Sequence, residues 1–148
     1  MRKCVIAALA LLISAASLAQ GLPADKIIGT WESVDASPRL RFEFYKQGSK
    51  YLGRLLYASN MYEADGKTPK RDHKNPDPKL RSRSRYGITN ITGLEYEEGE
   101  YTGGTLYNPE EGRTYSVKAK LKNADELDFR GYVGISLLGK TMKFRRIQ

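Results

Sequence analysis

The stretch Arg39-Leu40-Arg41-Phe42-Glu43-Phe44 alternates charged and apolar side chains without a break. Successive side chains of a strand point to opposite faces, so the apolar residues of this stretch share one face and the charged residues share the other. A period of two is typical of a half-buried strand, with one face against a core and the other in water. The stretch therefore predicts a sheet with one apolar side.

The same alternation recurs along the chain, whereas helical spacing is almost absent. Residues 115–121 alternate apolar side chains with serine and lysine, and residues 127–130 repeat the pattern. Short glycine-containing turns, such as 46–49, 97–100 and 108–112, separate the segments and favour antiparallel hairpins. About eight strands are predicted, at residues 27–34, 40–46, 51–57, 88–96, 101–107, 114–121, 127–133 and 140–147.

These strands predict an all-β fold with two possible arrangements. Eight antiparallel strands are enough to close into a single barrel. A two-sheet β-sandwich has the same alternation and remains the alternative. The segment from about residue 64 to residue 85 lacks apolar periodicity and is rich in proline and basic residues, so we expect a long loop there.

The N-terminus has the order of a secretory signal peptide. Arg2 and Lys3 precede an apolar run from Val5 to Ile13, and the small-residue stretch that follows favours cleavage after Ala19. The run is shorter than the roughly 18 apolar residues that a membrane anchor needs. We therefore expect residues 1–19 to be removed, residues 20–148 to form one domain, and the protein to be periplasmic or secreted without spanning the membrane.

Removal of the signal peptide also changes the chemistry of the chain. It takes away the only cysteine, Cys4, so disulfides and thiolate chemistry are not expected. The formal net charge falls from +8 to +6. Residues 67–85 hold eight basic and two acidic residues, a local excess equal to the whole remaining charge. An exported destination and the lack of interleaved aromatic residues argue against nucleic acid, and favour an acidic envelope component or an anionic small molecule as the partner.

Several ordered motifs resemble one bacterial family. They are Asn75-Pro76-Asp77-Pro78-Lys79-Leu80-Arg81-Ser82-Arg83, residues 103–115, Arg130-Gly131-Tyr132-Val133-Gly134 and residues 137–141. Together they are similar to the domain of unknown function family 2147. The resemblance implies an exported protein with a lipocalin-like β-barrel and no settled biochemical role.

The stretch Gly29-Thr30-Trp31 adds to the resemblance, because it is similar to the Gly-x-Trp signature of lipocalins. The resemblance implies that the indole of Trp31 closes the barrel floor under an arginine of the last strand, which we expect to be Arg146. A cation over an indole face is favourable by roughly 0.5 to 2 kcal/mol.

Candidate ligand-binding residues come from the basic segment and the tyrosines. In an extended chain Arg81 and Arg83 point to the same side, where they are able to clamp one carboxylate or phosphate, with Asp77 or Tyr107 completing the site. The alternative is that both arginines pair with the acidic run at residues 95–100. The residues predicted to bind a ligand are Arg81, Arg83, Tyr107, Tyr115, Arg130 and Tyr132.

Enzymatic chemistry has little support in the sequence. His73 is the only histidine, and its neighbours at consecutive positions are unable to face one metal ion together. No nucleophile elbow is present. We expect no enzyme activity, no metal and no cofactor. The predicted function is an exported binding protein that holds a small hydrophobic or amphipathic molecule in the barrel. The alternative is an interaction module that docks on an acidic envelope partner through the basic loop 67–85.

Overall fold

The computed structural model describes residues 22–148 of the chain, so the predicted signal peptide lies outside the described residues. The described part contains eight strands and three short 3-10 helices. The strands are β1 (Gly29–Ser33), β2 (Leu40–Gln47), β3 (Lys50–Ala58), β4 (Thr89–Glu97), β5 (Glu100–Asn108), β6 (Arg113–Asn123), β7 (Glu126–Tyr132) and β8 (Lys140–Arg146). The helices are η1 (Ala24–Ile27), η2 (Pro78–Leu80) and η3 (Ser136–Leu138).

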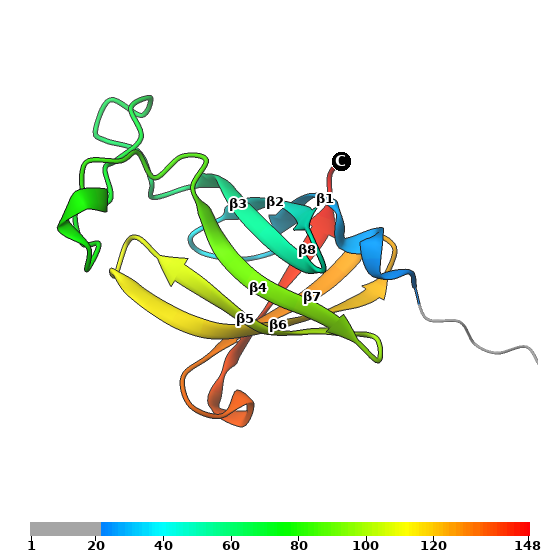
Figure 1. Cartoon of the computed structure of the whole chain (residues 1–148). Coiled ribbons are helices and arrows are strands. Elements are labelled where there is room, and N and C mark those ends of the chain that lie inside the picture. The colour runs from blue at the N-terminus through cyan, green and yellow to red at the C-terminus, as the bar shows by residue number, and fades with distance from the viewer. Residues whose placement is uncertain (1–21) are drawn as a thin grey trace, which may run out of the picture.

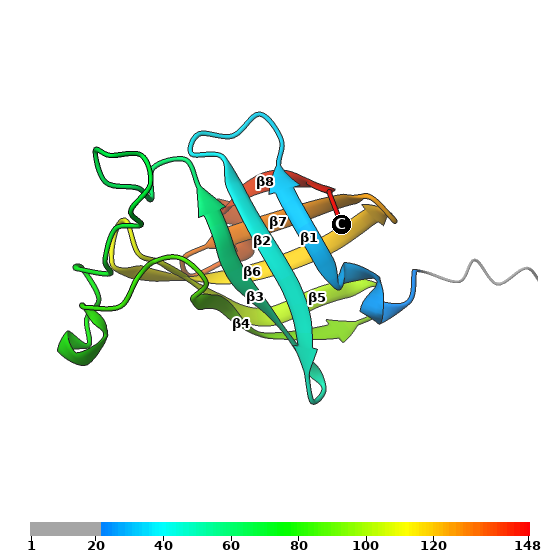
Figure 2. The same cartoon turned by 90° about the horizontal axis from the view of Figure 1, so that it is seen from above.

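The strands form one closed barrel in which each strand is antiparallel to the next (Figures 1 and 2). β8 returns to pair with β1, where Trp31 lies opposite Arg146 in the register. The barrel prediction is therefore confirmed, and the two-sheet sandwich is wrong. Every predicted strand is present, and its ends differ from the prediction by at most two residues.

The two ends of the barrel differ in their connections. Tight turns and η1 lie at one end, which is on the right of Figure 1. The connections between β1 and β2, β3 and β4, β5 and β6, and β7 and β8 lie at the other end, and the longest of them, residues 59–88, contains η2. We call these the closed end and the open end.

The closed end is sealed by a tryptophan under an arginine. Trp31 is fully buried, and its Nε1 donates a hydrogen bond to the Ile27 carbonyl at 2.8 Å. The guanidinium carbon of Arg146 lies 4.4 Å from the centre of the indole ring. Arg146 also donates to the carbonyls of Ile28 at 2.8 Å, Ala124 at 2.9 Å and Lys26. The two residues proposed for floor closure are thus in direct contact.

Three tyrosines hold the segment around η1 across the closed end. The hydroxyls of Tyr51, Tyr96 and Tyr101 donate to Asp25 Oδ1 at 2.5 Å, the Leu22 carbonyl at 3.0 Å and the Ala24 carbonyl, respectively. The hydrogen bond from Tyr51 lowers the pKa of Asp25, and burial raises the pKa of Tyr101. Side chains therefore fill this half of the barrel.

Candidate functional site

The open half of the barrel contains a cavity of about 430 Å³. Apolar side chains of the strands form its wall: Leu40, Phe42, Leu55, Ala58, Leu106, Phe129, Met142 and Phe144. The rings of Phe42 and Phe144 are 5.8 Å apart, and that of Phe129 lies 6.4 Å and 6.1 Å from them, respectively. These are distances at which aromatic rings attract one another, so the base of the cavity is a packed aromatic surface.

Polar side chains of the strands and open-end loops line the rest of the cavity. They include Asn60, Arg85, Asn90, Asn108, Glu110, Glu111, Tyr115 and Lys140. Arg85 is buried, and it donates to Glu110 at 2.5 Å and to the Arg71 carbonyl at 3.0 Å. Lys140 is exposed at the start of β8 and makes no ion pair within residues 22–148. An apolar wall with a few convergent polar groups is the usual composition of a small-molecule site.

Asn90 is a buried polar residue of the cavity lining, with 5% of its surface exposed. Its Nδ2 donates to the Tyr107 carbonyl at 3.1 Å, which fixes the orientation of the amide because only the nitrogen is able to face a carbonyl. Its Oδ1 has no hydrogen-bond partner among the described residues. A buried acceptor left unpaired costs about 1–3 kcal/mol. Asn90 is therefore a candidate acceptor for a polar group of a ligand.

The long connection between β3 and β4 is attached to the barrel through Asp72, whose side chain is fully buried. Its Oδ1 accepts from the Tyr107 hydroxyl at 2.6 Å, and its Oδ2 accepts from Arg83 Nε at 2.9 Å and from Asn75 Nδ2 at 2.8 Å. Three donors satisfy this carboxylate and offset the cost of burying it. Asp72 thereby ties the loop to β5 beside the cavity.

Arg81 and Arg83 do not form the predicted clamp. The backbone at Arg81 is helical, so the premise of an extended chain is wrong. Arg81 Nε donates to the Asn75 carbonyl at 2.8 Å, Arg83 binds Asp72, and Asp77 caps η2 by accepting from the Lys79 amide at 3.0 Å.

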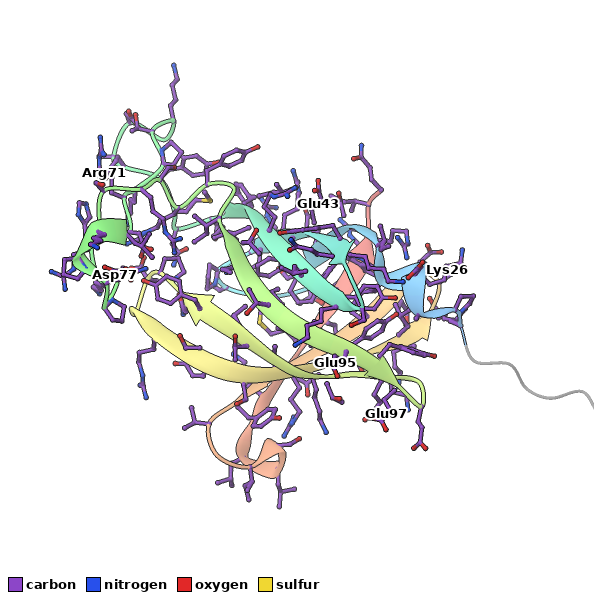
Figure 3. The ribbon with its side chains drawn as sticks, in the orientation of Figure 1. Lys26, Glu43, Arg71, Asp77, Glu95 and Glu97 are labelled. Atoms are coloured by element: carbon purple, nitrogen blue, oxygen red, sulfur yellow. The ribbon has the colours of Figure 1, made fainter. Side chains whose placement is uncertain are left out.

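The alternative pairing of these arginines with the acidic run at residues 95–100 is also not formed. Figure 3 shows the reason, because Arg71 and Asp77 of the long loop lie at the opposite end of the barrel from Glu97. Within residues 22–148, the member of the run that forms an ion pair is Glu95, whose Oε1 lies 3.5 Å from Lys50 Nζ.

Of the six predicted ligand-binding residues, Tyr107 and Tyr115 line the cavity. Burial and the hydrogen bond to Asp72 raise the pKa of Tyr107 to about 12. The Tyr115 hydroxyl donates a hydrogen bond to Glu111, and this bond raises the pKa of Tyr115. Arg130 instead holds the loop between β7 and β8, and Tyr132 is half-buried opposite Ser116; neither belongs to the cavity lining.

Four residues of this region were not predicted as site residues. Asp72 and Arg85 belong to the basic loop, where local charge gives no sign of burial, and Lys140 is one of many basic residues on the strands. Asn90 carries a usable signal, because an asparagine between Thr89 and Ile91 interrupts a strand with a residue that strands disfavour. Within residues 22–148 no group of His, Cys, Asp and Glu side chains is placed to hold a metal ion.

A closed eight-stranded antiparallel barrel with a sealed floor and an apolar cavity at the other end defines a lipocalin-like protein. The family model of DUF2147, described as an uncharacterized protein conserved in bacteria, matches residues 29–146, and the chain belongs to this family. No curated protein matches the chain.

A solved structure supports the same class. It is HP1028 from the human pathogen Helicobacter pylori, described as belonging to the lipocalin family. The two chains are 27% identical, the match covers 82% of this chain and 83% of that one, and the TM-score is 0.71. Among the described residues, no helix has the length and apolar character to cross a membrane.

Proposed function

We propose that the protein is an exported carrier that binds a small hydrophobic or amphipathic molecule in the barrel cavity, without catalysis. The main support for this proposal is the cavity, which combines an apolar wall, polar groups and an opening at one end. Its volume of about 430 Å³ lies within the range of about 300–1,000 Å³ that is usual for small-molecule sites. The pattern of residues 1–19 supports export.

In this proposal the apolar part of the ligand packs against the ring cluster of Phe42, Phe129 and Phe144. Burial of apolar surface supplies most of the binding free energy, at about 25 cal/mol per Å² removed from water. The polar head lies among the polar residues, where Lys140 offers a cation without an ion-pair partner in the described chain and Asn90 offers an unpaired acceptor. An amphiphile with an acidic head that also carries a hydroxyl or amide donor fits both groups.

The test uses dansyl-undecanoic acid, whose fluorescence rises and shifts to the blue in an apolar site. Met142 lines the cavity, whereas Lys143, its neighbour on β8, is exposed outside. We expect the wild type and Lys143→Trp to bind the probe, and Met142→Trp to lose at least about tenfold in affinity because the indole fills the cavity. Equal binding by the two variants, both folded by circular dichroism, would contradict the proposal.

The second candidate function is an interaction module that docks on an acidic envelope component through the basic loop 67–85. The exposed side chains of Lys67 and Lys79, which form no ion pair within residues 22–148, favour it. Reversal of both charges in Lys67→Glu/Lys79→Glu leaves the bonds of Asp72 intact. Retention of envelope-fraction binding by this variant at low salt would remove the candidate.

A further inference from the structure

The connection between β7 and β8 presents large aliphatic side chains to water. It projects away from the barrel wall as the orange loop at the bottom of Figure 1. Its four aliphatic residues, which we call the apolar tip, are Val133 (60% exposed), Ile135 (58%), Leu137 (82%) and Leu138 (77%). A contiguous group of exposed apolar side chains marks an interaction surface more often than chance exposure does.

The loop is held in the shape that exposes these side chains. Arg130 of β7 donates from Nε to the Ser136 carbonyl at 2.7 Å, from Nη2 to the Leu137 carbonyl at 3.2 Å, and from Nη1 to Thr141 Oγ1 at 2.7 Å. Gly139 lies so close to the backbone of β7 that a Cβ there would stand 2.6 Å from the Gly131 carbonyl oxygen. These contacts fix the tip away from the barrel core.

Part of the backbone of the tip is hydrogen-bonded within the loop and to Arg130. The Ile135 carbonyl accepts from the Leu138 amide at 3.2 Å, and the Ser136 carbonyl accepts from the Gly139 amide at 3.1 Å as well as from Arg130. Three consecutive carbonyls, those of residues 135–137, therefore have partners. An unpaired backbone group is the main cost of placing a chain in hydrocarbon, so this loop enters an apolar phase at reduced cost.

The surroundings of the tip are basic. Residues 130–141, which comprise the loop and the strand ends beside it, contain Arg130 and Lys140 and no acidic residue. Arg130 and Lys140 stand at the two ends of the loop, and Lys118 of β6 lies opposite Arg130 in the sheet. Lys140 also lines the cavity, so the tip stands beside the cavity mouth.

We propose that the apolar tip inserts into the surface of an anionic lipid bilayer and brings the cavity mouth against it. The bilayer supplies an apolar phase for the four aliphatic side chains and negative headgroups for the cations at their base. A second copy of this chain fits less well, because the same cations would face each other. Transfer of a ligand between bilayer and cavity rests on the proposed function, whereas the membrane contact does not.

The test is co-sedimentation of the purified protein with vesicles of phosphatidylcholine mixed with phosphatidylglycerol, and with vesicles of phosphatidylcholine alone. We expect binding to the mixed vesicles that weakens with salt, and a loss of at least about tenfold in Leu137→Ser/Leu138→Ser. The matched control is Val34→Ser/Leu80→Ser, which removes two partly exposed apolar side chains of other open-end loops and is expected to change binding less than about twofold. Equal binding by wild type and Leu137→Ser/Leu138→Ser, with both folded, overturns the proposal.

Two further measurements separate this proposal from its alternatives. The only native tryptophan, Trp31, is buried in the floor, so Leu137→Trp adds a reporter whose emission is expected to shift to the blue when mixed vesicles are added. If the wild type forms a dimer that Leu137→Ser/Leu138→Ser abolishes, and if the wild type does not bind vesicles, a second copy of the chain rather than a bilayer covers the apolar tip, and the proposal is overturned. Met142→Trp is expected to bind vesicles like the wild type, because the substitution lies in the cavity and not in the apolar tip. If the wild type binds vesicles but not dansyl-undecanoic acid, the carrier proposal is rejected and the proposed membrane contact is retained.

Discussion

Replacement of Asp72 by alanine is expected to release the long β3–β4 connection while the barrel stays folded. The buried carboxylate accepts from Tyr107 at 2.6 Å, from Arg83 at 2.9 Å and from Asn75 at 2.8 Å. Asp72→Ala leaves all three donors without this acceptor. Because two of them belong to the loop and the third to β5, the change acts on the attachment of the loop rather than on the strands.

The size of the effect follows from these contacts. Removal of one partner of a buried ion pair costs about 3–5 kcal/mol. Arg83 has 34% of its side chain exposed, so its guanidinium is able to hydrogen-bond to water once Asp72 is gone. We therefore expect a cost at the lower end of this range, about 3 kcal/mol. Each 1.4 kcal/mol is about tenfold in population, so the detached loop becomes about 100-fold more populated. Asp72→Asn keeps an acceptor for Arg83, and its amide is able to donate to Tyr107. We therefore expect the population of the detached loop to rise by about tenfold or less in this variant.

Trypsin under native conditions is the assay, because the loop contains eight basic residues between positions 67 and 85. When opening is fast relative to cleavage, the cleavage rate follows the open population. The matched control is Asp77→Asn, which changes an exposed cap of η2 and is expected to raise the rate less than about fivefold. Cleavage of Asp72→Ala no faster than that of Asp77→Asn would refute the role of Asp72, and far-ultraviolet circular dichroism verifies that the barrel persists.

Three further predictions concern the floor, the response to alkali and the packing of the sheet. Arg146→Ala removes the cation over Trp31 and three hydrogen bonds to backbone carbonyls, so the free energy of unfolding measured in urea should fall by about 2–4 kcal/mol. A fall of less than about 1 kcal/mol would argue against floor closure by Arg146. The pKa of Tyr107 is about 12 in the folded protein and about 10 in the unfolded chain, so its contribution to stability is complete below about pH 10 and is lost as the pH rises toward 12. Urea unfolding across this window should show a shallower decline for Tyr107→Phe, and an equal slope would contradict the raised pKa. A Cβ at Gly53 would stand 2.8 Å from the isoleucine side chain opposite it on β4, so Gly53→Ala should lower the free energy of unfolding by about 1–3 kcal/mol. Gly131→Ala has nothing within 4 Å of the added Cβ, so it should change the free energy of unfolding, measured by thermal denaturation, by less than about 0.5 kcal/mol. Similar effects of the two substitutions would count against this packing.

The strands were predictable because each one has an apolar face and a wet face, a pattern that depends only on neighbouring residues. Ile27 shows the limit of this reasoning. Alternation predicts it at the start of the first strand, but it lies in η1, where its fully buried side chain helps to fill the floor. Closure itself depends on pairing between β1 and β8, more than a hundred residues apart, and the Gly-x-Trp resemblance indicated it where alternation did not.

The candidate site was less predictable, because its contacts are set by how a loop folds back on the barrel. Charge and spacing from Arg81 predict a ligand contact for Arg83, yet its partner is a buried aspartate that precedes it by 11 residues and also accepts a hydrogen bond from a tyrosine of β5. Local charge predicts neither burial nor partner. Arg130 is predicted to orient the polar head of a ligand, but its hydrogen bonds go to two carbonyls of the neighbouring loop and to Thr141.

Native mass spectrometry of the protein, purified without detergent from its native cells, tests the carrier proposal most directly. We expect a species heavier than the polypeptide by one small molecule that organic solvent extracts. This species should persist in Lys143→Trp and disappear in Met142→Trp. A bare polypeptide mass under gentle conditions, together with no uptake from a panel of fatty acids and lipids, would contradict it.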